Sequence, residues 1–204
     1  MTMICSPRMM AQAYDHLDIP NDNCLITVKY QGTRPTITDF VTAYLNFKKE
    51  ETFFDKVYKE WNLYLQKKAL SPTVSISNDV KNGYMRYDLI RPEGNDTLFM
   101  EMCFWNCADG KHKLVAANVV WLSEGDYGWT DYIGTHFLLY DNKTRIMRSV
   151  YPEDIGALYE GDGLSVFFLP RKGKNIRVSA AGGGDRWNEV LIWDGYRFSS
   201  KKVN

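Results

Sequence analysis

The stretch that most constrains this chain runs from Thr97 to Leu122, where two long apolar segments flank the dipeptide Asp109-Gly110. Asp-Gly tolerates the positive φ angles of a type I′ turn, so the pattern predicts a β-hairpin. The first segment alternates between the two faces of a strand. The second, from Leu114 to Leu122, is apolar almost throughout, which is typical of a strand covered on both faces. We therefore expect a central hairpin onto which later strands are added.

Length and composition indicate an ordinary globular domain. The chain has 204 residues, 45% of them apolar, with 25 basic and 25 acidic side chains. A net charge of zero gives no reason to expect a nucleic-acid partner, and no segment is apolar and long enough to predict a membrane span. The aromatic content is high, with 6 Trp, 13 Tyr and 10 Phe. It favours a β-rich core, and the alternative is a stacking surface for sugars or peptides.

Helical periodicity dominates between residues 36 and 70. Aromatic side chains recur on one helical face, which is typical of a helix packed against a sheet. Thr36 followed by Asp39, and Thr52 followed by Asp55, resemble capping-box signals at helix starts. We expect two helices, over residues 37–49 and 53–69, the second ended by Ser71-Pro72.

From Gly83 onward the apolar period switches to two, and short turn signals separate the segments. The strands expected there are Tyr84–Ile90, Leu98–Asn106, Lys113–Leu122, Tyr132–Tyr140, Arg145–Val150, Leu164–Leu169, Ile176–Ala180, Glu189–Trp193 and Tyr196–Phe198. Such short connections join neighbouring strands antiparallel. The predicted fold is therefore α+β, with two N-terminal helices packed on a curved antiparallel β-sheet, a meander of six to nine strands. Residues 14–204 are expected to form a single domain.

The first residues bear on the cellular compartment. Ala11-Gln12-Ala13 fits the small-x-small pattern of a signal-peptidase site. The residues before it lack the basic and apolar regions of a complete signal peptide. We interpret residues 1–13 as the remnant of a truncated signal peptide, which predicts a periplasmic or secreted protein, and the alternative is a cytoplasmic one.

Two segments carry a resemblance to a known group of proteins. These are Met102–Val115, which reads MCFWNCADGKHKLV, and Leu191–Phe198, which reads LIWDGYRF. They resemble segments of uncharacterised exported β-rich proteins of Bacteroidetes, and the likeness covers about a third of the chain. The resemblance implies export and a β-rich domain, and it implies no activity.

Candidate catalytic and metal-binding groups are few. Cys103 and Cys107 would lie about 13 Å apart on a regular strand. Buried thiols are therefore expected, although a bulge near Asn106 could bring them into disulfide reach. The sequence contains three histidines, none in a nucleophile motif. His112 is expected to be exposed beside the hairpin turn, and His136 to be a hydrogen-bonded structural residue. No catalytic residue, metal site or cofactor is predicted.

One constellation indicates a binding site. The segment from residue 121 to residue 132 interleaves aromatic and acidic side chains in a glycine-containing loop. The candidate ligand-binding residues are Trp121, Glu124, Asp126, Tyr127, Trp129, Asp131 and Tyr132. Flat rings suit the apolar faces of sugars, and carboxylates suit their hydroxyls. The sequence thus predicts an exported, non-enzymatic binding or interaction module with a glycan or peptide ligand. The alternatives are a glycosidase-like hydrolase that uses carboxylates of residues 124–131, and a loop that merely covers the end of the sheet.

Overall fold

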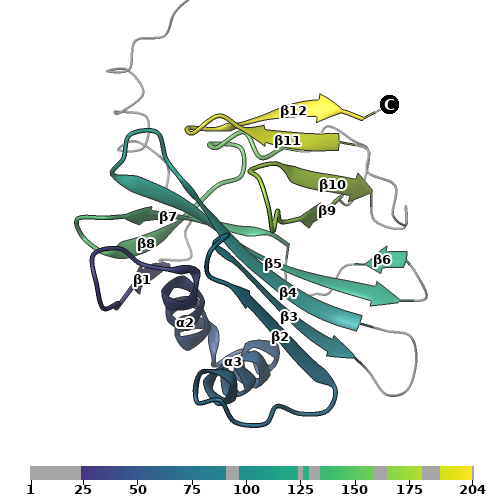
Figure 1. Ribbon diagram of the computed structural model, residues 1–204. Coiled ribbons are helices and arrows are strands. Elements are labelled where there is room, and N and C mark those ends of the chain that lie inside the picture. Colours follow the sequence, from purple (N-terminus) through teal and green to yellow (C-terminus); the bar gives the residue numbers. More distant parts are fainter. Residues whose placement is uncertain are drawn as a thin grey trace, which may run out of the picture.

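The computed structural model describes residues 24–90, 97–123, 126–128, 134–158, 165–180 and 189–203. The predicted signal-peptide remnant, residues 1–13, lies outside the described residues. Within them the chain forms two antiparallel sheets and two helices (Figure 1).

The larger sheet is built around the predicted hairpin. Its eight strands are β1 (Leu25–Thr27), β2 (Val74–Asp79), β3 (Tyr84–Ile90), β4 (Thr97–Asn106), β5 (His112–Ser123), β6 (Asp126–Gly128), β7 (His136–Asp141) and β8 (Ile146–Val150). They follow the order β1-β8-β7-β5-β4-β3-β2, and β6 pairs with the end of β5. The central hairpin is confirmed, because β4 pairs with β5 along the whole length of β4, from Thr97 opposite Leu122 to Asn106 opposite Lys113.

Two helices cover one face of this sheet. They are α2 (Ile37–Lys48) and α3 (Thr52–Leu65). The first helix starts as predicted, since the Asp39 carboxylate accepts the backbone N–H of Thr36 at 2.7 Å and its hydroxyl at 2.8 Å. The second predicted cap is wrong by one residue, because the N-cap of α3 is Glu51 and Thr52 already lies in the helix.

The smaller sheet packs on the opposite face of the larger one. Its strands are β9 (Ser165–Phe168), β10 (Ile176–Ala180), β11 (Glu189–Trp193) and β12 (Phe198–Lys202), in the order β12-β11-β10-β9. Figure 1 shows the resulting layers, with the helices below the larger sheet and the smaller sheet above it. The shared core includes a ring cluster in which the Phe198 centroid lies 5.4 Å from that of Trp105, 4.9 Å from Trp193 and 6.1 Å from Phe137.

The predicted fold class is therefore wrong. The chain is mostly β, its first helix follows β1, and its last four strands form a second sheet instead of extending a meander. Strand β5 shows the physical reason. Val115 and Ala117 pack in the core beneath the helices, whereas Leu114 and Ala116 pack in the core shared with the smaller sheet. Two helices cover only one apolar face, so the second face needs another layer.

Candidate functional site

The predicted binding segment begins in β5 and returns through β6. Trp121 pairs with Gly128 and Ser123 with Asp126, so the segment forms a short two-stranded ribbon at the backbone level. Glu124, Trp129, Asp131 and Tyr132 lie outside the described residues, as do the side chains of Trp121, Asp126 and Tyr127. Glycan or peptide binding through this segment stays a prediction, and so does the hydrolase alternative that depends on its carboxylates.

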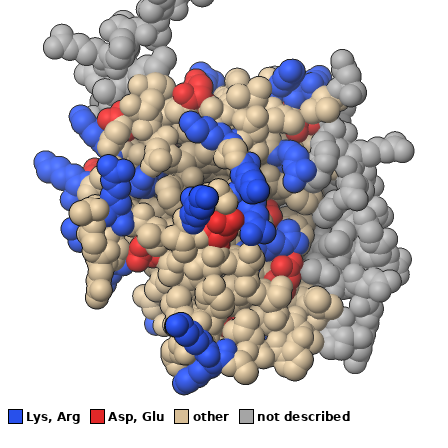
Figure 2. Space-filling model, viewed as in Figure 1, with Lys and Arg blue, Asp and Glu red and all other residues tan. Residues whose placement is uncertain are grey.

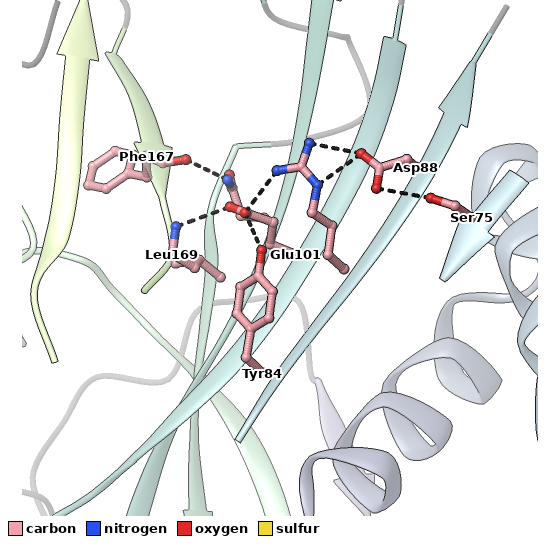
Figure 3. Close-up of polar contacts among 8 residues, drawn as sticks. Ser75, Tyr84, Asp88, Glu101, Phe167 and Leu169 are labelled. Atoms are coloured by element: carbon pink, nitrogen blue, oxygen red, sulfur yellow. Dashed lines mark hydrogen bonds and ion pairs between the residues drawn. The ribbon is translucent and has the colours of Figure 1, made fainter. Parts of the chain in front are cut away.

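A buried polar cluster joins the two sheets on the face of β4 opposite the helices (Figure 3). Its centre is Glu101, which is 3% exposed. The Glu101 carboxylate accepts the Tyr84 hydroxyl at 2.5 Å, the Arg86 guanidinium at 3.2 Å and the backbone N–H of Leu169 at 3.1 Å. Burial raises the pKa of Glu101, and the donors Tyr84 and Arg86 offset part of that effect.

The surrounding contacts of this cluster are also made within the protein. Arg86 forms an ion pair with Asp88 at 2.8 Å, and its guanidinium lies 3.9 Å from the Phe99 ring centroid. The Asn118 amide donates to the backbone carbonyl of Phe167 at 2.5 Å, which adds a further bond between the sheets. Because protein groups supply these donors and acceptors, we interpret the cluster as a set of structural contacts that hold the two sheets together.

A second group of hydrogen-bonded side chains lies between the larger sheet and the helices. His136 Nε2 is 2.7 Å from the Ser149 hydroxyl, and His136 Nδ1 is 3.3 Å from the Tyr44 hydroxyl. A serine beside a histidine resembles a nucleophile and its base. However, Ser149 and Tyr44 are each 1% exposed, so the chain of bonds belongs to the core. The expected hydrogen bonding of His136 is confirmed, and its structural role stays an interpretation.

A polar pocket lies at one end of the larger sheet, where three connections meet. These are the loop from β1 to α2, the β4–β5 turn and the β7–β8 turn, which Figure 1 shows together at the left. The pocket has a volume of about 380 Å³. The lining side chains that carry its chemistry are Tyr30, Arg34, Asn106, Cys107, His112 and Lys113.

The β4–β5 turn is shaped by an aspartate side chain. The Asp109 carboxylate accepts the backbone N–H groups of Lys111 at 2.8 Å and His112 at 3.0 Å. The predicted type I′ turn, which needs positive φ at both central residues, is wrong, because Gly110 has φ +68° and Asp109 does not have a positive φ. The backbone N–H of Asn142 donates to the Lys111 carbonyl at 2.9 Å and so joins this turn to the β7–β8 turn.

Lys113 is the buried charge of the pocket. It is 8% exposed, its ammonium donates to the side-chain oxygen of Asn106, and its nitrogen lies 5.0 Å from the centroid of the Phe104 ring. Burial lowers the pKa of Lys113, the positive charge of Arg34 lowers it further, and Cys107 counteracts part of this shift. Among the residues that the structure describes, no Asp or Glu lines the pocket. The described part of the site therefore concentrates positive charge without a matching carboxylate.

Two acidic side chains, Asp109 of the β4–β5 turn and Asp141 at the end of β7, contact His112. His112 Nδ1 lies 2.5 Å from Asp109 Oδ2, and Nε2 lies 3.9 Å from Asp141 Oδ2. Burial raises the pKa of Asp109, but hydrogen bonds from His112 and Lys111 outweigh that effect and hold it below its usual value. The His112 side chain is 12% exposed, so the expectation that it is exposed is wrong.

Neither Arg34 nor Lys113 stood out in the sequence. Arg34 lies in an irregular loop, and Lys113 is the first residue of a predicted strand. The signal that could have identified Lys113 is its position on the same face as Val115 and Ala117, which pack beneath the helices. A lysine on a buried face with no acidic partner among the described pocket residues is unusual, because buried charges in proteins are normally paired.

Positive charge is also prominent on the molecular face in view in Figure 2, where Lys and Arg side chains are more widespread than Asp and Glu. The described residues contain no group of three or more His, Cys, Asp or Glu side chains that could hold a metal ion. Within the same residues, Cys24, Cys103 and Cys107 are thiols, and neither helix is long and apolar enough to cross a membrane.

The fold and the pocket together define a mostly β protein of three layers with a cationic pocket at one end of its larger sheet. No protein-family model, curated protein or solved structure matches the chain.

Proposed function

We propose that this chain is a non-enzymatic binding module that holds a small anionic ligand in the pocket between the β1–α2 loop and the β4–β5 turn. The observation that carries the proposal is the position of Lys113, which is buried in the same pocket as Arg34, where none of the described lining residues carries a carboxylate. A ligand with a carboxylate, phosphate or sulfate group would supply the missing negative charge. Arg34 is exposed, so it is accessible to a ligand arriving from solvent.

A buried ammonium is energetically costly unless it is paired with an opposite charge. Asn106 and the Phe104 ring offer only a dipole and a ring face, which compensate an ammonium less than a carboxylate does. Evolution commonly places such locally unfavourable groups at binding sites, where a ligand completes their interactions. A bound anion would stabilise the charged form of Lys113 and hence the folded protein.

Ligand binding is tested by thermal unfolding of the wild type and the Lys113→Met variant with and without phosphate, sulfate and small carboxylates, at constant ionic strength. At a ligand concentration of 100 times Kd, binding adds about 2.7 kcal/mol to the free energy of unfolding. We expect at least one of these anions to raise the melting temperature of the wild type and to leave that of Lys113→Met unchanged. Lys111→Met is the matched control, because Lys111 is exposed two residues away.

The ligand-free Lys113→Met variant has its own expected result. It should be as stable as the wild type or more stable, since methionine fills the space of the side chain without a buried charge. The folded-state pKa of Lys113 is below its unfolded value of about 10.4, so this stability cost is present at neutral pH and disappears as pH rises toward that value. An anion response in Lys113→Met equal to that of the wild type, or no response in either protein, would contradict the proposal.

Export stays a prediction, based on Ala11-Gln12-Ala13 and on the resemblance to exported proteins. It is tested by sequencing the N-terminus of the protein from its native host. Mature protein that begins at Tyr14 and lies outside the cytoplasm would support export, whereas intact Met1 in the cytosolic fraction would contradict it.

A further inference from the structure

The environment of Lys113 differs from that of two lysines in ion pairs. Lys48, which is half-buried, pairs with Glu51 at 2.8 Å, and Lys59, which is exposed, pairs with Asp55 at 2.7 Å. Lys113 instead lies in a pocket, and its nitrogen is positioned by an amide oxygen and an aromatic ring. A primary amine presents three hydrogen-bonding directions, and Asn106 takes one of them. The nitrogen is thus held in place in a cavity that can also hold a ligand.

An amine in this setting is suited to nucleophilic chemistry. Only the neutral form of a lysine side chain carries the lone pair that attacks a carbonyl carbon. Desolvation and a neighbouring cation are the two means by which proteins favour that form, and Lys113 experiences both through its burial and through Arg34.

We infer that Lys113 forms an imine with a small carbonyl compound that carries an adjacent acidic group, of the 2-oxo acid class, and that Arg34 binds the acidic group. This inference rests on the proposed anion-binding function and names its ligand class. A 2-oxo acid places its carboxylate one bond from its ketone, so a guanidinium and an amine that share one pocket match its two functional groups. The arginine stays charged while the lysine reacts.

The condensation balances without an oxidant or reductant. The Lys113 nitrogen lone pair attacks the ketone carbon, a C–N bond forms, and the carbonyl electron pair moves to oxygen, which takes up a proton. The resulting carbinolamine loses its hydroxyl group with a second proton as water, and the nitrogen becomes doubly bonded to carbon. Amine plus ketone thus gives imine plus water, and hydrolysis reverses the reaction.

The test incubates the full chain with pyruvate as the probe in the presence of sodium cyanoborohydride. This reagent reduces an imine to a stable secondary amine. Peptide mapping by mass spectrometry then identifies the modified lysines. Lactate has the carboxylate without the ketone, and acetone has the ketone without the carboxylate. We expect pyruvate to modify Lys113 at least about tenfold more than Lys111, a ratio that corresponds to about 1.4 kcal/mol. Arg34→Met should lower the pyruvate adduct at Lys113 by a larger factor than the acetone adduct, because acetone loses only the effect of the neighbouring positive charge whereas pyruvate also loses the group that binds its carboxylate.

The outcomes separate this inference from the proposed function. If lactate raises the melting temperature of the wild type but not of Lys113→Met, and pyruvate leaves no adduct on Lys113, the imine is excluded and the anion pocket stands. If no anion binds, the proposed function fails and the inference fails with it. Equal pyruvate labelling of Lys113 and Lys111, or equal labelling of Lys113 by acetone and pyruvate, would also overturn the inference. Circular dichroism of Arg34→Met and Lys111→Met checks that both variants are folded.

Discussion

Replacing Glu101 with alanine is expected to lower the free energy of unfolding by about 3–5 kcal/mol, the range for breaking a buried charged interaction from one side. The substitution removes the acceptor for the Tyr84 hydroxyl and for the Leu169 N–H, and leaves Arg86 with Asp88 as its acidic partner. The loss would be a large part of the 5–15 kcal/mol typical of a domain. Urea denaturation followed by circular dichroism measures it.

Two variants control this experiment. Glu101→Gln keeps the shape and one acceptor oxygen, so its loss should be smaller than that of alanine. Glu51→Ala removes an acidic group whose ion pair with Lys48 is partly exposed, and it should cost less than about 1 kcal/mol. If Glu101→Ala costs no more than Glu51→Ala, the cluster in Figure 3 does not hold the two sheets together.

Replacing Phe198 with alanine is expected to cost about 3–5 kcal/mol, because a ring that is 1% exposed would leave a cavity between the sheets. Its ring contacts Trp105 of β4, Phe137 of β7 and Trp193 of β11, so it belongs to the core that both sheets share. Phe198→Leu keeps part of the volume and should cost less than alanine.

The matched control for this prediction is Ile192→Ala. Ile192 lies opposite Ser199 in the same sheet and is 36% exposed, so its truncation removes fewer buried contacts. Denaturant titration of both variants compares them under the same conditions. A loss for Phe198→Ala as small as that for Ile192→Ala would mean that the smaller sheet does not depend on this ring cluster.

Local patterns in the sequence predicted many of the elements. The bounds of β3, β10 and β11 match the predicted strands Tyr84–Ile90, Ile176–Ala180 and Glu189–Trp193. Strand β2 was missed because four of the six residues of Val74–Asp79 are polar and the apolar–polar alternation covers only the first four residues. The second helix was predicted four residues too long, since the chain leaves the helix after Leu65 and Lys67 takes a φ of +55°. The local sequence thus predicts which segments form helices and strands more accurately than it predicts the residue at which each element ends.

The functional site depends on tertiary structure more than the helices and strands do, so it was harder to predict from the sequence. The aromatic and acidic loop was found by composition, but its side chains lie outside the described residues. The cationic pocket was not found, because Arg34 and Lys113 are 79 positions apart in numbering and meet only through the packing of the β1–α2 loop on the end of the hairpin. A charged residue in a strand signals a site only when its face and its neighbours are known.

By itself the sequence determined the central hairpin, the two helices and the apolar character of both faces of β5, because those features depend on the period of neighbouring residues. Tertiary structure alone decided that the last four strands form a second sheet, that Glu101 joins the two sheets and that Lys113 shares a pocket with Arg34. The physical reason is that strand pairing and burial are set by contacts between distant segments, and the free energy of each contact depends on which partner covers it.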